Sequence, residues 1–188
     1  MKDRIISSEK IYFRSISIND IDGGWLEWIN DKNSRKFLST RKKQTKKKLV
    51  QYLEESTPPS AYMFAVCLVE NDKYIGNARL SSVDRINNKC TYGRLIGDKN
   101  LRGKGIGTEI LKLLAHYAFY NLNLNRIETG VVRKNTASIR SNEKAGFVSE
   151  GILRESELIN GTYEDVVRFS MLRSDFEEKY LQEKICKS

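Results

Sequence analysis

Hydrophobic and polar positions divide the chain into short strand-like runs separated by amphipathic helical segments. The strand-like runs are apolar or alternating, rich in β-branched and aromatic residues, and bounded by turn residues. They cover residues 11–16, 62–69, 74–80, 90–96, 126–132, 148–159 and 163–172. The last two flank Asn160-Gly161, a residue pair strongly favoured in a tight β-hairpin turn.

Helical segments are marked by apolar residues three and four positions apart and by capping residues at their ends. They are predicted to begin after Asn19 or Asp20 and to cover residues 45–55, 108–122, 136–145 and a polar tail from 174. The resulting order is strand, two helices, three-strand meander, helix, strand, helix and hairpin. This order predicts one α/β domain over residues 1–188, with a core over about 10–175 and a helical tail over 174–188. We expect a mixed, mostly antiparallel sheet with helices on both faces.

The composition fits this picture, since 188 residues with 39% hydrophobic and 30% charged side chains can form one packed domain. The sequence contains neither an apolar stretch long enough to span a membrane nor a recognisable signal peptide. Cys67, Cys90 and Cys186 lie far apart without ligand spacing, so we expect reduced thiols, no metal site and a cytoplasmic location.

The formal net charge of +9 favours anionic partners. Much of the excess lies in one basic run, Arg35, Lys36, Arg41, Lys42, Lys43, Lys46, Lys47 and Lys48. This run fits a solvated surface, a surface that steers phosphate groups, or a nucleic-acid contact. The chain has no zinc-finger spacing or RNA-binding aromatic signature, which argues against the last.

A polar, glycine-rich loop over 98–107 separates a predicted strand from the longest predicted helix. Gly103, Gly105 and Gly107 allow close backbone approach, the helix start adds N–H donors, and Arg102 and Lys104 add charge. The loop fits a diphosphate cradle, although a flexible connection would have similar glycines. It is neither a Walker A loop nor a G-x-G-x-x-G loop in register.

Two motifs extend this interpretation. Arg102-x-x-Gly105-x-Gly107 resembles the acetyl-CoA signature Q/R-x-x-G-x-G/A of the GNAT superfamily of N-acetyltransferases. Asn135-Thr136-Ala137-Ser138, followed by Glu143-Lys144-Ala145-Gly146-Phe147, is similar to its second signature. The segments from Glu150 and Asn160 look like the C-terminal hairpin of the ribosomal-protein and sugar-nucleotide branches, and the resemblance covers about residues 10–175.

The resemblance implies a sheet that splays open at an acetyl-CoA site, with acetyl-CoA as co-substrate. The backbone of the loop would hold the pyrophosphate, and the preceding strand end would run beside the pantetheine arm. Asn135 would contact the pantetheine or simply cap its helix. The residues implied in cofactor binding are Leu95, Ile96, Gly97, Arg102, Gly103, Lys104, Gly105, Ile106, Gly107, Thr108, Asn135 and Ser138.

The implied reaction is direct attack of a neutral amine on the thioester, which needs a base for the amine and a proton for the leaving thiolate. We expect Glu128 or Asp98 to act as the base, with Glu27 as an alternative. The family commonly has a tyrosine acid seven residues after the motif asparagine. Here that residue is Asn142, so the thiolate leaves unassisted or takes its proton from water or another residue. The single histidine, His116, is expected to pack within its helix.

The acceptor site is expected to contain Trp28, Asn30 and Arg94, because two segments around them are similar to sugar-nucleotide acetyltransferases. The favoured acceptor is therefore a nucleotide-linked amino sugar. The alternatives are a protein N-terminus, as in the ribosomal-protein branch, and a non-catalytic acyl-CoA-binding module. A homodimer is compatible with the fold.

Overall fold

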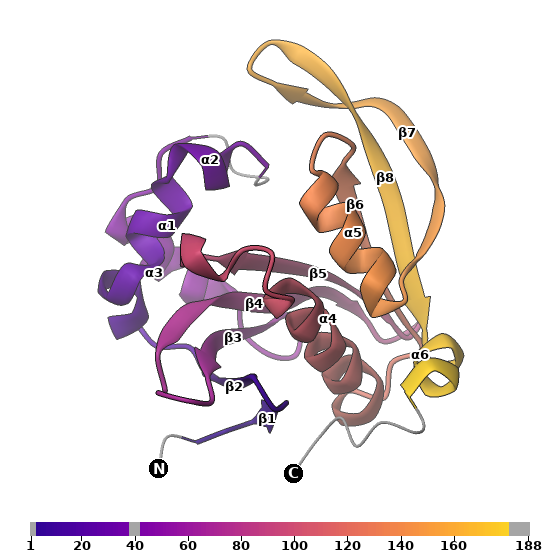
Figure 1. Ribbon diagram of the computed structural model, residues 1–188, viewed down its shortest axis with the longest axis horizontal. Helices are drawn as coiled ribbons and strands as arrows, with labels where there is room; N and C mark the ends of the chain where they lie inside the picture. Colours follow the sequence, from indigo (N-terminus) through magenta and orange to yellow (C-terminus); the bar gives the residue numbers. More distant parts are fainter. Residues whose placement is uncertain (1–2, 38–41, 181–188) are drawn as a thin grey trace.

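The computed structural model describes residues 3–37 and 42–180 and contains one eight-stranded sheet in the order β1-β2-β3-β4-β5-β6-β8-β7 (Figure 1). The strands are β1 (Ile6–Ser7), β2 (Ile11–Ser15), β3 (Tyr62–Leu68), β4 (Tyr74–Asp84), β5 (Lys89–Ile96), β6 (Arg126–Val132), β7 (Val148–Ile159) and β8 (Thr162–Leu172). The predicted strands are thus confirmed, with small shifts at their ends.

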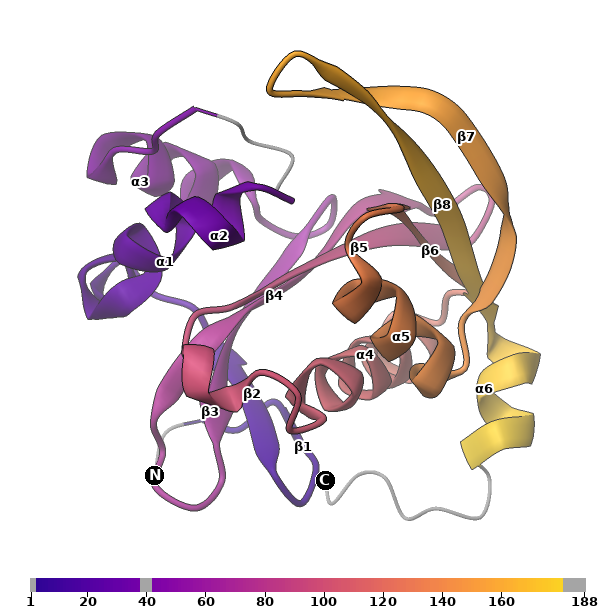
Figure 2. The ribbon, with the colours of Figure 1, turned by 45° about the horizontal axis from the view of Figure 1, so that its top comes forward.

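Two groups of helices accompany the sheet, one before β3 in the chain and one after β5 (Figure 2). The first group is η1 (Ile21–Trp25), α1 (Leu26–Asn30), α2 (Lys32–Arg35) and α3 (Lys46–Glu55). The second group is η2 (Lys99–Leu101), α4 (Ile106–His116), η3 (Tyr117–Asn121), α5 (Thr136–Ala145) and α6 (Arg173–Tyr180).

The sheet is covered on both faces, as expected, because successive side chains of a strand point in opposite directions. On β3, Phe64 belongs to the large core that includes α4, whereas its neighbour Met63 packs with Trp25 and Leu49. These two hydrophobic clusters fix α4 to one face and the first helices to the other.

The sheet opens between β5 and β6. These strands are parallel and pair only over Lys89–Thr91 with Arg126–Glu128, whereas all other neighbouring strands are antiparallel. Beyond Thr91 and Glu128 the two strands are no longer paired. This confirms the predicted splayed, mixed sheet and places a gap between two strand ends.

Local signals account for most of the element boundaries. Thr45 and Asn135 cap α3 and α5 by accepting from the N–H groups of Lys48 and Ser138, respectively. The helix expected after Asn19 or Asp20 is broken instead, because Gly24 within η1 has a φ of 133°.

The C-terminal helix differs from expectation. The polar tail from residue 174 is expected to be helical, and α6 begins at Arg173, but it also buries Phe176 and Tyr180 against the core. His116 packs against the rings of Tyr120 and Phe176, at centroid distances of 4.7 and 6.2 Å, as predicted.

Cys67 and Cys90 are buried free thiols, while Cys186 lies outside the described residues. Among the described residues, no helix is long and apolar enough to cross a membrane.

Candidate active site

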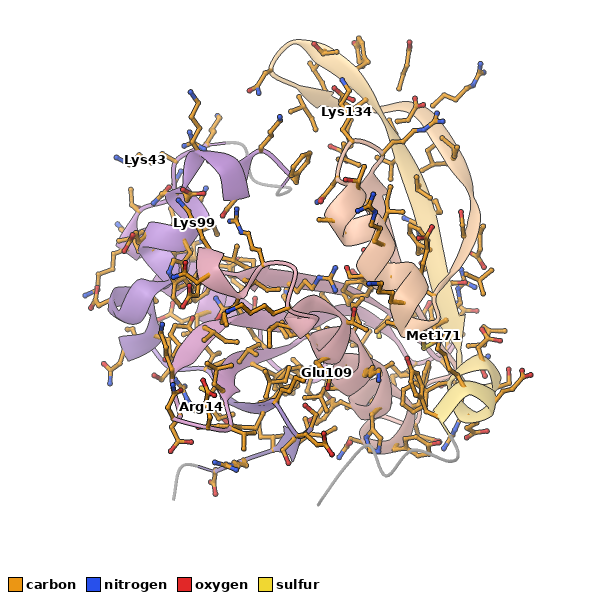
Figure 3. All side chains as sticks on the ribbon, viewed as in Figure 1. Arg14, Lys43, Lys99, Glu109, Lys134 and Met171 are labelled. Atoms are coloured by element: carbon orange, nitrogen blue, oxygen red, sulfur yellow. The ribbon has the colours of Figure 1, made fainter. Side chains whose placement is uncertain are left out.

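A cleft of about 1100 Å³ occupies the gap between β5 and β6. Its walls come from the free ends of these strands, the loop before α4, the exposed side of α5, the end of α2, and the β7–β8 hairpin. Figure 3 labels Lys99 and Lys134 on opposite sides of the opening that separates the N-terminal helices from the hairpin.

The loop before α4 forms an anion cradle within this cleft. Gly103 and Gly105 have φ values of 77° and 83°, and a Cβ atom built on either would meet nothing within 4 Å. The N–H groups of Gly105, Ile106 and Gly107 find no acceptor among the described residues. Because these donors lie at the start of an 11-residue helix, the helix dipole adds to their attraction for phosphate. The cradle therefore fits the diphosphate of coenzyme A.

The cleft is strongly cationic. Its described lining contains six basic side chains and one carboxylate, that of Glu157. The basic residues are Lys36, Arg94, Arg102, Arg140, Lys144 and Arg168. Arg140 and Lys144 are four residues apart on α5, so they lie on one side of that helix beside the cradle. This spacing is visible in the sequence, although neither residue is among the predicted site residues.

Arg94 joins the elements that surround the cradle. Its guanidinium donates to the carbonyl of Gly107 at 2.6 Å and to the hydroxyls of Ser138 and Ser141. It thereby ties the first turn of α4 to α5. Burial lowers the pKa of Arg94. The structure thus places Arg94, expected at the acceptor site, on the cofactor side of the cleft.

The cofactor residues predicted from the sequence are largely brought together. Those that line the cleft are Leu95, Ile96, Arg102, Gly103, Gly105, Gly107, Thr108, Asn135 and Ser138. Gly97 is covered by the indole of Trp28, Ile106 is buried in the core, and Lys104 is exposed outside the lining.

Trp28 and Asn30 are absent from the lining. The Trp28 indole packs against Tyr74 at a centroid distance of 4.9 Å and lies directly on Gly24 and Gly97. Asn30 exchanges two hydrogen bonds with the backbone of Gln44, at 2.9 and 2.8 Å. Both side chains therefore fix the N-terminal helices, and the structure does not bring them to an acceptor site.

Glu128 lies on β6 at the last position paired with β5. Its carboxylate faces Arg126 at 3.0 Å, Arg168 at 3.5 Å and Lys89 at 4.0 Å. Glu128 is outside the described lining, although Arg168 connects it to the cleft. Its role as the base stays a prediction, and its engagement with three cations does not support it.

Asp98 also lies outside the lining, and it has a structural position. Its carboxylate accepts from Lys73 at 2.7 Å and caps η2 through the N–H of Asn100 at 2.9 Å. The Lys73 hydrogen bond and this N–H group lower the pKa of Asp98, which makes the carboxylate a weaker base.

Asn142, at the position of the family's tyrosine acid, is fully buried on α5. Its side-chain oxygen accepts a short hydrogen bond from the hydroxyl of Tyr92 on β5. Tyr92 lines the cleft next to Thr129, whose hydroxyl lies 3.5 Å from the Tyr92 carbonyl oxygen. No local sequence pattern signals this pairing, because the two residues are 50 positions apart.

The sequence and fold match known acetyltransferases. Residues 10–148 match the acetyltransferase (GNAT) domain family. The chain is 37% identical over 133 residues to the probable N-acetyltransferase YjcK of Bacillus subtilis, covering 71% of this chain and 74% of that protein. It is 32% identical over 102 residues to a spermidine N(1)-acetyltransferase of Vibrio cholerae, covering 54% and 58% of the two chains.

A solved structure gives the same result for the fold. The crystal structure of spermidine N-acetyltransferase from Vibrio cholerae in complex with CoA and spermine superposes with a TM-score of 0.81 at 24% identity, covering 88% of this chain and 97% of that one. The family match over most of the chain, the splayed sheet and the cradle together support one assignment. The protein is an acetyl-CoA-dependent N-acetyltransferase and belongs to the GNAT family.

Proposed function

We propose that this enzyme acetylates the primary amine of a small acceptor that carries negative charge, with a nucleotide-linked amino sugar as the representative substrate. The observation that carries the proposal is the charge of the cleft, with six basic side chains and one carboxylate in its described lining.

Acetyl-CoA is itself anionic, so part of this charge serves the co-substrate. Arg102, Arg140 and Lys144 lie around the cradle and match the phosphates of coenzyme A. Arg168 lies elsewhere. On β6, Ile127 and Val131 face the α4 core, so Glu128 and Gly130 point to the opposite face. The guanidinium of Arg168 reaches Glu128 and lies against Gly130, on that opposite face.

Arg168 therefore supplies positive charge on the acceptor side, and Lys36 lines the same cleft from the end of α2. Two like charges 4 Å apart repel by about 1 kcal/mol in water and more in a partly enclosed site. A polyamine with several ammonium groups would meet this repulsion, whereas a diphosphate next to the amine would be attracted. The charge pattern thus favours an anionic acceptor over a polycationic one.

The residues of the cleft support amine transfer as follows. The cradle and α5 hold the co-substrate, which supplies the thioester carbonyl when bound. The N–H of Gly97 is already bonded to Ile75 at 2.9 Å, which leaves Leu95 and Ile96 as the backbone donors of this strand end for the carbonyl oxygen. Glu128 stays the predicted base, but its contact with Arg168 does not favour that role, and Asp98 is fixed as a helix cap.

Polyamines form the second candidate, because the Vibrio cholerae relatives are named for spermidine. Acetylation of a protein N-terminus is a further alternative, since the chain is 34% identical over 110 residues to a putative ribosomal N-acetyltransferase of Bacillus subtilis. A homodimer also remains a proposal.

The test is release of free coenzyme A thiol with matched acceptors: a nucleotide-linked amino sugar, the same amino sugar without its nucleotide, spermidine, and an N-terminal peptide. We expect the highest kcat/KM for the nucleotide-linked amine. Arg168→Gln should lower kcat/KM for this acceptor about tenfold and leave the free amino sugar nearly unchanged. Equal or better turnover of spermidine would refute the anionic acceptor. Coenzyme A binding without thiol release for any of the four acceptors would favour a non-catalytic acyl-CoA-binding module.

A further inference from the structure

Tyr92 occupies the point where the sheet opens. It is the first residue of β5 after Thr91, the last residue paired with β6. The side chain is 9% exposed, and the ring packs edge-on against Phe147 at a centroid distance of 5.4 Å. Tyr92 is also the only tyrosine in the described lining of the cleft, which contains no histidine or cysteine.

Asn142 holds the Tyr92 hydroxyl in a defined orientation. The side-chain N–H of Asn142 donates to the carbonyl of Ser138 at 2.9 Å, so its oxygen faces Tyr92 and accepts from the phenol. The phenol therefore reaches the tip of the side chain at position 142. Burial also raises the pKa of Tyr92, so the phenol carries its proton at neutral pH.

A carboxamide cannot donate a proton to a leaving thiolate, because its N–H groups are not acidic at neutral pH, whereas a phenol with an ordinary pKa near 10 can. Asn142 therefore serves as a hydrogen-bond acceptor, and the acidic proton at this point of the site belongs to the Tyr92 hydroxyl.

We propose that Tyr92 is the general acid of this acetyltransferase, acting from β5 with its hydroxyl positioned by Asn142. The N–C bond to the acceptor forms as the C–S bond breaks, and the electron pair of the C–S bond goes to sulfur. Tyr92 then gives its phenolic proton to this sulfur after rotation about its Cζ–Oη bond. The proton lost by the amine returns to Tyr92 through solvent, so no other reactant is needed. The proposal rests on acetyl transfer and does not depend on the class of acceptor.

Tyr92→Phe keeps the ring against Phe147 and removes only the hydroxyl, so the variant should fold. We expect kcat to fall about 100-fold, the lower end for general acid catalysis, because a thiolate is a tolerable leaving group. The KM for acetyl-CoA should change much less. Adding Asn142→Tyr to this variant places a phenol on α5 where the Tyr92 hydroxyl was. This double variant should have a kcat at least about tenfold above that of Tyr92→Phe. A Tyr92→Phe enzyme with kcat within twofold of the original would overturn the proposal.

A binding measurement tests the same contact without any acceptor. By calorimetry, Tyr92→Phe should weaken the binding of coenzyme A about threefold to tenfold, the usual contribution of one hydrogen bond. The binding of desulfo-coenzyme A, which lacks the sulfur, should be unchanged. An equal loss for both ligands would mean that Tyr92 only supports the site, and the proposal would fail. This comparison needs no acceptor, so it can be made even if none of the tested acceptors is acetylated. Failure of the proposed acceptor class can therefore be told apart from failure of the proposed role of Tyr92.

Discussion

Replacing Gly97 with alanine tests whether Trp28 is a packing residue. A Cβ atom on Gly97 would lie 1.8 Å from Cδ2 and 2.2 Å from Cε2 of the Trp28 indole. The indole would have to retreat by about 1.6 Å to regain an ordinary 3.4 Å contact. Tyr74 and the bare α-carbon of Gly24 confine it from other sides. Overpacking of this kind costs about 1–3 kcal/mol, so the melting temperature should fall by roughly 4–8 °C for a middle value.

The assay is thermal unfolding followed by calorimetry and by tryptophan fluorescence. Gly93→Ala is the matched control, because Gly93 lies on β5 four residues before Gly97 and a Cβ atom there would meet nothing within 4 Å. Its melting temperature should stay the same or rise slightly, because alanine reduces the conformational entropy of the unfolded chain. In a Trp28→Ala background, Gly97→Ala should cost less than about 0.5 kcal/mol. Equal shifts for Gly97→Ala and Gly93→Ala would refute the packing role of Trp28.

Three further predictions concern the cradle and the charged network. Gly105→Val should destabilise the fold by about 1–2 kcal/mol, because φ is 83° there, and calorimetry should also show weaker coenzyme A binding. The control is Gly161→Val, at φ 82° outside the cleft, which should lower stability similarly but leave coenzyme A binding unchanged. Glu128→Gln should lower the free energy of unfolding by about 1–3 kcal/mol, measured with denaturant, because it breaks the contacts with Arg126 and Arg168. It should leave kcat within about threefold, and a 100-fold loss of kcat in a folded variant would instead establish Glu128 as the base. The Arg126 and Ser170 hydrogen bonds lower the pKa of Glu150 to about 2, below its value in the unfolded chain. The stabilisation from these contacts is therefore present above about pH 4.5 and is lost as the pH falls toward 2. Glu150→Gln should flatten that part of a plot of stability against pH, and an unchanged plot would contradict the pairing.

The strands, caps and hairpin were predictable because their signals are local. Asn160 and Gly161 both have positive φ, 51° and 82°, which is the conformation their residue types favour in a two-residue turn. Asn135 sits three positions before the N–H that it caps, within reach of a sequence pattern. The anion cradle was likewise predictable, since its glycines and its helix start are adjacent in the chain.

The role of Trp28 was not predictable, because an aromatic residue beside basic residues fits both a stacking surface and a packing contact. What decides between them is Gly97, which lies 69 positions later and offers a bare backbone for the indole. The sequence shows both residues but not that they meet. The same limit applies to Tyr92 and Asn142, whose hydrogen bond crosses from β5 to α5.

The positive charge of the cleft comes mostly from outside the basic run that first suggested phosphate binding. Of that run, Arg41 lies outside the described residues, Lys46 pairs with Asp22 at 2.6 Å, and only Lys36 is among the described residues that line the cleft. Arg94, Arg140 and Arg168 each stand in segments without a run of charge. Their effect arises because β5, α5 and β8 converge where the sheet opens, and a cluster formed in this way leaves no trace in local composition. The proposed preference for an anionic acceptor therefore depends on the splay of the sheet. Substitutions at Arg168 should change acceptor choice more than substitutions at Lys46, which tests the two sources of charge against each other.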